Sequence, residues 1–157
     1  YTFNIYIFGD RAMSTIFADK FKNTSGGNPV QINQLRGIDT AGSITVQGEG
    51  TATTNLQQGL VKVWIKFDMS SSFTNEDSFN VSSLDDDGTG DFGLNFTNNM
   101  ANANYPAPAS AGEDNANVLT NFGTVATSAM DGQTRQTQAN SAIDKSNNSV
   151  CVLGDLA

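Results

Sequence analysis

The chain has 157 residues, a mass of 16.6 kDa and a formal net charge of −8, and Asn, Thr, Ser and Gly make up about 40% of it. It contains no His and a single Cys, Cys151, which excludes histidine-dependent nucleophilic catalysis, histidine-bearing zinc sites and an intrachain disulfide. The acidic balance predicts no binding to nucleic acid, and no apolar run approaches the roughly 20 residues of a membrane-spanning helix, so we expect no membrane insertion.

The N-terminal third of the chain has weak patterning. Residues 1–12 are interpreted either as an additional β-strand or as sequence upstream of a natural start at Met13. Residues 13–59 are expected to form an attachment or extended region, with short extended pieces between glycines. The abundance of polar, uncharged residues favours turns and sheet surfaces over helix interiors, so we expect little helix anywhere in the chain.

Residues 60–68 carry the clearest strand pattern, an alternation of period two. The face expected to be buried carries Val61, Val63, Ile65 and Phe67. The other face carries Lys62, Trp64 and Lys66. A large aromatic side chain on a lysine face has two interpretations, packing beneath a loop or forming a subunit contact, and both stay open for Trp64.

Residues 78–84 and 91–97 are predicted to form a hairpin, joined by an acidic turn over residues 85–91. Clustered carboxylates are ligands that Ca²⁺ prefers, so Asp85, Asp87 and Asp91 are the candidate metal ligands. A solvated hairpin turn is the alternative. An EF-hand is excluded because Phe96 occupies the position of its closing Glu, and we expect no cofactor.

Residues 98–117 are predicted to form a long loop with an extended Tyr-Pro-Ala-Pro segment. If this loop binds a sugar, Tyr105 supplies a stacking ring and the Asn102 and Asn104 side chains supply hydrogen bonds. A solvated connection is the alternative interpretation of the same residues.

A strand is predicted over residues 118–125, and residues 131–148 show no clear pattern. The final strand, within residues 149–157, is apolar on both faces, which indicates either a central strand or a subunit interface. Val150 and Val152 are therefore candidate interface residues together with Trp64. Short strands separated by Gly, Asn and Asp turns predict an all-β fold, an antiparallel β-sandwich or jelly-roll-like domain with long loops, over residues 60–157.

Several segments of the chain form an ordered set: VKVWIKFD (61–68), DSFNVSS (77–83), DGTGD (87–91), LNFT (94–97), MANANY (100–105) and VCVLGDL (150–156). In this order they resemble segments of tail-fibre-like and other virion proteins of marine bacteriophages. The sequence from Met13, MSTIFADKFKNTSGG, is similar to the N-termini of those proteins, whereas residues 106–149 are only loosely similar.

The resemblance implies a non-enzymatic virion structural protein on the surface of a phage particle. It also implies a homotrimer that contacts other virion proteins, with a host surface glycan as a further partner. A chain of 157 residues has no room for the long shaft and tail-anchoring domain of a tail fibre, so a tail-fibre-like short appendage, a head fibre, a capsid decoration protein or the terminal domain of a longer fibre is expected. The alternative is a soluble carbohydrate-binding module.

Overall fold

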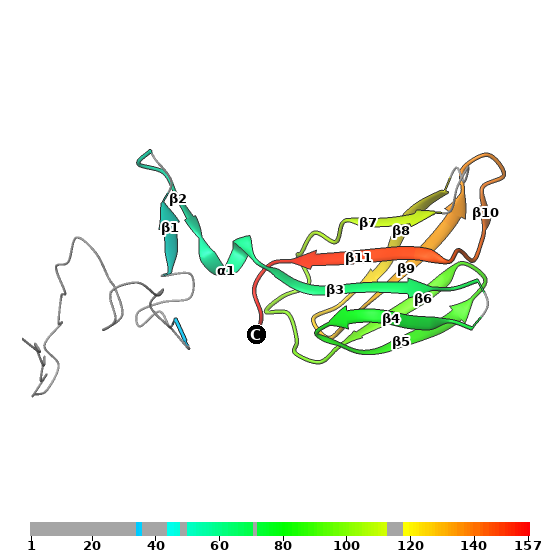
Figure 1. Ribbon diagram of the computed structural model, residues 1–157, viewed down its shortest axis with the longest axis horizontal. Coiled ribbons are helices and arrows are strands. Elements are labelled where there is room, and N and C mark those ends of the chain that lie inside the picture. Colours follow the sequence, from blue (N-terminus) through cyan, green and yellow to red (C-terminus); the bar gives the residue numbers. More distant parts are fainter. Residues whose placement is uncertain (1–33, 36–43, 48–49, 71, 113–117) are drawn as a thin grey trace, which may run out of the picture. The chain divides into compact units, whose positions relative to one another are not determined.

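A computed structural model (Figure 1) describes part of the chain, namely residues 34–35, 44–47, 50–70, 72–112 and 118–157. The chain divides into two units, Tyr1–Arg36 and Gly37–Ala157, and the elements described below all belong to the second. The prediction for residues 1–12 lies outside the described residues, as does much of the predicted attachment region.

The described residues form eleven strands and one helix of four residues. In chain order they are β1 (Thr45–Gln47), β2 (Thr53–Asn55), α1 (Leu56–Gly59), β3 (Val61–Asp68), β4 (Thr74–Phe79), β5 (Val81–Gly88), β6 (Asp91–Phe96), β7 (Ala109–Gly112), β8 (Val118–Val125), β9 (Ala129–Gln136), β10 (Ser141–Ala142) and β11 (Asn147–Leu153). Within this described part, no helix is long and apolar enough to cross a membrane.

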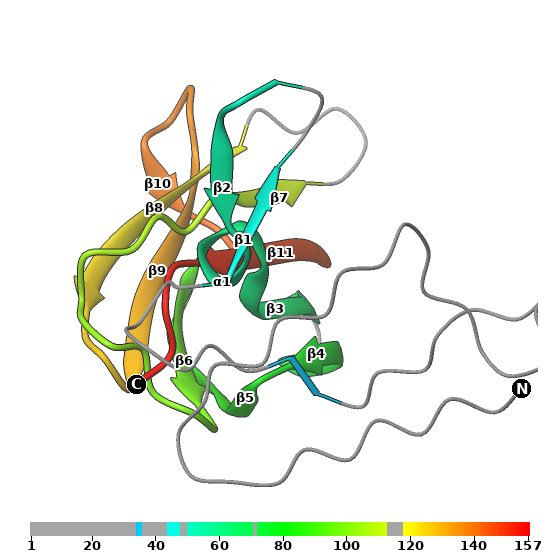
Figure 2. The same cartoon turned by 90° about the vertical axis from the view of Figure 1, so that its left-hand side faces the viewer.

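The strands form two larger antiparallel sheets and a separate β1–β2 pair. The first sheet has the order β4-β3-β11-β7. The second sheet has the order β10-β9-β6-β5, with β8 also paired to β9. Figure 2 shows the two sheets as separate layers that face each other. The predicted all-β antiparallel sandwich is therefore confirmed, and the final strand, β11, is a central strand of the first sheet.

The core lies between the two sheets. Val63, Ile65 and Phe67 of β3 are buried as predicted, and the Phe67 ring meets the ring of Phe92 in β6 with 4.9 Å between the centroids. The same prediction is wrong for Val61, which is 41% exposed. The register between β3 and β11 shifts at this end of the strand, which breaks the alternation that the sequence shows.

Lys62 also departs from the predicted outer face, because its side chain is buried. Its Nζ donates hydrogen bonds to the carbonyl oxygens of Gln57 and Leu60, at the end of α1. A lysine can lay its apolar stem along a protein surface while its ammonium group binds polar atoms at the rim. The contact ties the end of α1 to β3, the first strand of the sandwich.

Asn80 is the corner residue at which the chain passes from the first sheet to the second, between β4 and β5. Its φ of 61° lies in the left-handed region, which Asn tolerates better than most residues. The Asn80 side-chain Nδ2 donates to the Lys62 and Asn98 carbonyls, each at 3.1 Å, and its Oδ1 accepts from the Asn98 backbone N–H at 2.7 Å. One side chain therefore connects β3, the corner and the segment that follows β6.

Three features of the fold differ from the sequence prediction. The segment 78–84, predicted as one strand, is divided by the Asn80 corner between β4 and β5. The predicted loop 98–117 contains β7, and residues 131–148, which show no clear pattern, contain most of β9 and all of β10. β9 escapes a hydrophobicity pattern because two of its three buried residues, Gly132 and Thr134, are not large apolar residues.

We expect the Asn80→Ala variant to lose about 2 kcal/mol or more of unfolding free energy, because alanine lacks the side-chain hydrogen bonds and disfavours the left-handed backbone. Urea unfolding followed by tryptophan fluorescence measures the loss. The matched control is Asn104→Ala in the exposed loop, which should change stability by less than about 0.5 kcal/mol. Equal stability of the two variants would contradict the role assigned to the corner.

The Gly132→Ala variant tests the packing of the core. A Cβ at Gly132 would lie 2.3 Å from the Cζ of Phe92, whereas a Cβ at Gly123 meets nothing closer than 3.8 Å. We therefore expect Gly132→Ala to destabilise the protein by roughly 1–3 kcal/mol through overpacking. Gly123→Ala, in the neighbouring strand, should leave the melting temperature nearly unchanged in differential scanning calorimetry, and a comparable loss in both variants would refute the explanation.

Candidate functional site

The acidic segment 85–91 is a strand followed by a tight turn, not a turn over its whole length. Asp85, Asp86 and Asp87 belong to β5, and the turn to β6 is formed by Thr89 and Gly90. Asp85 Oδ2 accepts a hydrogen bond from the Asn95 Nδ2 at 2.5 Å, and Asp86 Oδ1 accepts from the Gly88 N–H. Neighbouring groups in the hairpin therefore occupy two of these carboxylates.

The predicted metal ligands are not brought together by this geometry. Asp91 accepts a hydrogen bond from the side chain of Gln133 on β9, away from Asp85. Among the described residues there is no group of three or more His, Cys, Asp or Glu side chains that could hold a metal ion. The prediction of a metal site at Asp85, Asp87 and Asp91 is corrected accordingly. The reason is that the hairpin extends the acidic segment along β5 instead of folding it around a centre.

Tyr105 has a structural role in this fold. Its hydroxyl lies within hydrogen-bond distance of the carbonyl oxygens of Ala126, at 2.9 Å, and Ala129, at 3.2 Å, and its ring packs against Phe96. The ring is half-buried against the core, so the predicted stacking surface is largely occupied by the protein itself. Asn102 and Asn104 are exposed, and Asn102 Oδ1 accepts from the Asn104 N–H in a local turn.

The Tyr105→Phe variant tests this role. We expect a loss of about 0.5–1.5 kcal/mol in unfolding free energy at neutral pH, because the hydroxyl bond is removed while the ring packing remains.

Burial raises the pKa of Tyr105 above its ordinary 10.0, so the folded protein holds this proton more tightly than the unfolded chain. The unfolding free energy of the native protein should therefore exceed that of Tyr105→Phe by less and less as the pH rises through and above 10.0. Urea titrations at several alkaline pH values would contradict this if the advantage grew.

The three predicted interface residues have different environments. Val150 and Val152 are buried in the core that their own chain forms, so they are unavailable to another subunit and that prediction is corrected. The physical reason is that β11 is a central strand, and its alternate residues face the second sheet. Trp64 is 36% exposed on the outer face of the first sheet, as the alternation predicts.

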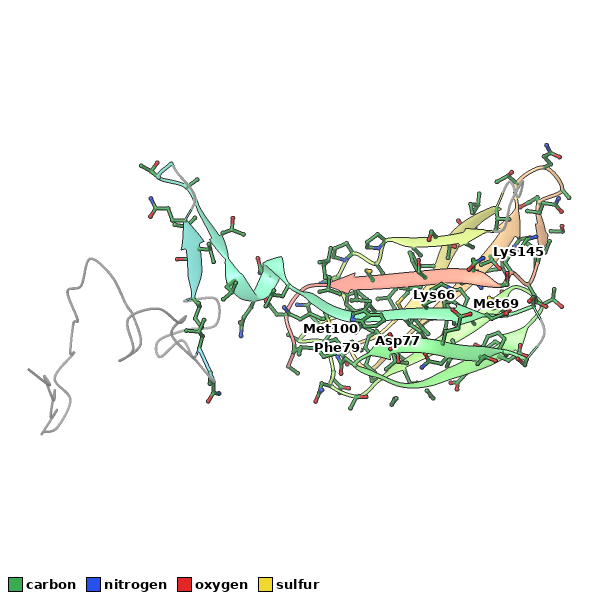
Figure 3. The ribbon with its side chains drawn as sticks, in the orientation of Figure 1. Lys66, Met69, Asp77, Phe79, Met100 and Lys145 are labelled. Atoms are coloured by element: carbon green, nitrogen blue, oxygen red, sulfur yellow. The ribbon has the colours of Figure 1, made fainter. Side chains whose placement is uncertain are left out.

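Trp64 belongs to a row of side chains across the outer face of the first sheet. Its cross-strand partners are Phe79 on β4, which is 52% exposed, and the half-buried Cys151 on β11. We call Trp64, Phe79 and Cys151 the aromatic row. Beside it lies Lys66, whose Nζ forms an ion pair of 2.5 Å with Glu76, and the next cross-strand pair is Ser149 with Ser110 (Figure 3 labels Lys66 and Phe79).

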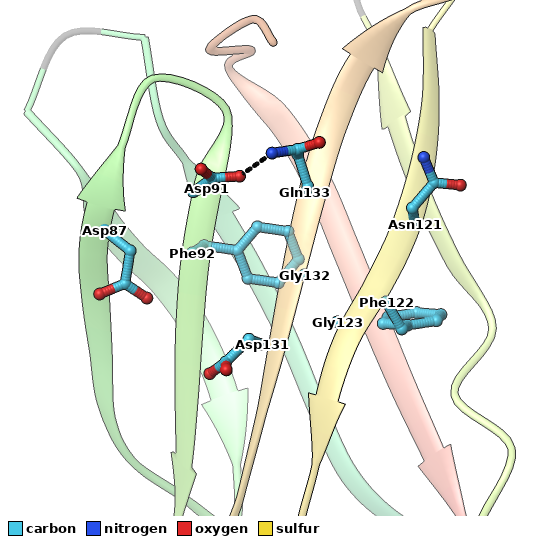
Figure 4. A pocket seen from close by; sticks show the side chains of 9 residues that line it. All are labelled: Asp87, Asp91, Phe92, Asn121, Phe122, Gly123, Asp131, Gly132 and Gln133. Carbon is cyan, nitrogen blue, oxygen red and sulfur yellow. Dashed lines mark hydrogen bonds between the residues drawn. The ribbon is translucent and has the colours of Figure 1, made fainter.

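The outer face of the second sheet carries a groove that sequence reasoning missed. It encloses about 580 Å³ over β5, β6, β9 and β8 (Figure 4). The polar side chains along it are Asp87, Asp91, Asn121, Asp131 and Gln133. Phe92 and Phe122 also border it, and both lie opposite the inward-facing Gly132. The sequence singles out Asp87 and Asp91 in the acidic segment, but the alternation of Asp131 and Gln133 in residues 129–136 is obscured by the small and polar inward residues of β9.

A glycine leaves room for two of the groove carboxylates. The position of a Cβ on Gly93 would lie 3.1 Å from the Asp87 Oδ2 and 3.7 Å from the Asp131 Oδ1, so both carboxylates lie over this glycine of β6. Figure 4 shows the Asp131 carboxylate directed toward β6. The side chains of Asp87, Asp131 and Asn121 form no hydrogen bond with any other residue that the structure describes.

Comparison of the chain with protein-family models, with curated proteins and with solved structures gave no match. The class that the structure defines is therefore that of an antiparallel β-sandwich with two chemically different outer faces. One face carries the aromatic row, and the other carries the acidic groove.

Proposed function

We propose that this protein is a non-enzymatic structural protein of a bacteriophage virion, a short surface appendage that assembles with copies of itself and with other virion proteins. Within this proposal the assembly is a homotrimer, and the contact surface is the outer face of the first sheet. The support from the sequence is the resemblance of residues 13–105 and 150–156 to virion proteins. The exposed aromatic row is the observation that carries the self-association.

The aromatic row exposes neighbouring aromatic side chains to water, which is unfavourable in free energy. Isolated apolar residues are normal on a protein surface, but a contiguous apolar patch marks an interaction surface. Trp64 and Phe79 lie directly opposite each other on adjacent strands, so a partner that covers one also covers the other. Aromatic residues are enriched at the centres of protein interfaces because they bury a large area with few rotatable bonds.

The charge distribution favours the first sheet over the second as the face through which copies meet. A protein of net charge −8 repels its own copies at long range. Around the aromatic row, Lys66 is paired with Glu76 and lies opposite Asp77 on β4, so these three side chains leave one negative charge. The neighbouring Ser110–Ser149 pair is uncharged. The outer face of the second sheet instead carries Asp85, Asp87, Asp91 and Asp131. Like-charge repulsion is therefore smallest when copies meet through the first sheet.

Light scattering on the full chain is the test of assembly. We expect the native protein to have about three times the chain mass of 16.6 kDa, and the double variant Trp64→Ser, Phe79→Ser to be monomeric. The matched control is Leu119→Ser, which removes a side chain of similar exposure, 40%, from the second sheet and should leave the mass unchanged. Circular dichroism confirms that each variant is folded.

A stable monomer would overturn the proposed trimer, and would favour the alternative of a soluble carbohydrate-binding module. A trimer that survives the double variant would show that copies meet through another surface. Dissociation by Leu119→Ser would place the contact on the second sheet instead.

A further inference from the structure

We propose that the groove on the second sheet is a saccharide-binding site, in which Asp87, Asp131 and Asn121 bind sugar hydroxyls. The inference does not rest on the trimer proposed above, because the groove lies on the opposite sheet from the aromatic row. It also places sugar binding at residues other than Tyr105, Asn102 and Asn104.

The size of the groove suits a small ligand. Binding sites for small molecules typically enclose about 300–1,000 Å³ and combine apolar surface with a few convergent polar groups. The groove, at about 580 Å³, lies within this range. It runs over several strands of one sheet, so its walls are held by the ladder hydrogen bonds of β5, β6, β9 and β8. Such walls are more rigid than the long loop that carries Tyr105.

The polar groups of the groove are ready to bind an external ligand. The Asp87 and Asp131 carboxylates and the Asn121 amide have no side-chain hydrogen bond within the described residues, as noted above. An ionised carboxylate can only accept hydrogen bonds, so the ligand must present donors. The amide of Asn121 both donates and accepts, which matches a hydroxyl group that does the same.

Asp91 and Gln133 form a second, internally ordered part of the site. Gln133 donates from Nε2 to Asp91 Oδ1, and its Oε1 in turn accepts from Arg135 Nη1. The second guanidinium nitrogen, Nη2, donates to the Asn140 carbonyl at 2.9 Å. This chain fixes the orientation of the Gln133 amide at the groove wall, and a fixed polar group loses little side-chain entropy when a ligand binds.

Hydroxyl donors distinguish a saccharide from the other ligands that carboxylates accept. A metal ion is disfavoured because the described residues contain no cluster of three or more metal-binding side chains. An organic cation needs only charge, whereas the groove also offers the Asn121 and Gln133 amides. Vicinal hydroxyls both donate and accept hydrogen bonds, so a saccharide satisfies the carboxylates and the amides together.

The experiment begins with the full chain on a printed array of neutral, N-acetylated and acidic oligosaccharides. The strongest neutral binder is then titrated into isotopically labelled protein, with amide shifts followed by NMR. We expect the largest shifts at Asp87, Asn121 and Asp131. Raising the salt from about 0.05 M to about 0.5 M should change the affinity little, because screening weakens the binding of a cation but not of a neutral sugar.

Two variants test the groove in different ways. Asp131→Asn removes a carboxylate acceptor, and we expect about a tenfold or greater loss of affinity. Gly123→Val leaves every polar group in place and adds bulk at a position where a Cβ has room beside Asp131, so it should block binding without unfolding the strand. The matched control is Asp86→Asn, which also removes one negative charge, here from β5, and keeps an oxygen for the Gly88 N–H. This variant should bind the sugar as the native protein does.

Four outcomes would overturn the inference. The first is no binding to any neutral oligosaccharide on the array, and the second is a set of amide shifts centred on the Tyr105 loop. The third is an equal loss of affinity in Asp86→Asn and Asp131→Asn. The fourth is strong binding of Ca²⁺ or putrescine that disappears at high salt while no sugar binds. Because each readout is independent of the number of copies in the assembly, a monomeric protein that binds sugar refutes the proposed trimer and supports the groove. A trimer that binds no sugar does the reverse.

Discussion

The packing of Phe92 between Phe67 and Gly132 is the contact on which the sandwich depends. Phe92 reaches across to the first sheet through the Phe67 ring, and it can do so because its cross-strand neighbour Gly132 has no side chain in the way. The remaining core residues of β3, β6 and β11 fill the space that this contact sets between the two layers. The role of Gly132 is therefore to leave the space of a Cβ empty, because the Phe92 ring occupies that space.

The two outer faces follow from the same alternation that builds the core. When Val63, Ile65 and Phe67 face inward, Trp64 must face outward, and the register of β3 with β4 places Phe79 opposite it. In the second sheet, inward Gly132 requires outward Asp131 and Gln133, which become walls of the groove. An apolar surface with few charges and an acidic, grooved surface thus arise on opposite sides of one small domain, and the functions proposed for them do not compete for space.

Local patterning predicted some elements well and others badly, for identifiable reasons. The prediction of a strand at residues 60–68 succeeded because β3 is buried on one face only, so its alternation is visible. The strand of Val150 and Val152 is apolar on both faces, a pattern that fits a subunit interface and a central strand equally, and only the sheet order decides for the central strand. Tyr105 resembled an exposed ring because nothing in its own segment reveals the carbonyls of residues 126 and 129 that meet its hydroxyl.

What can be derived from the chain without its fold is the set of properties that depend on composition and on neighbours in sequence. These are the all-β class, the strands with one buried face, the existence of a hairpin between residues 78–84 and 91–97, and the absence of histidine chemistry. The corner at Asn80, the separation of Asp91 from Asp85, and the meeting of Asp87 with Asp131 over Gly93 are decided by strand register and by pairing between distant segments. A period-two pattern specifies which face of a sheet a residue occupies, but it does not specify which strand lies beside it. A site built from four strands depends on which strands are neighbours, so only the tertiary structure decides it.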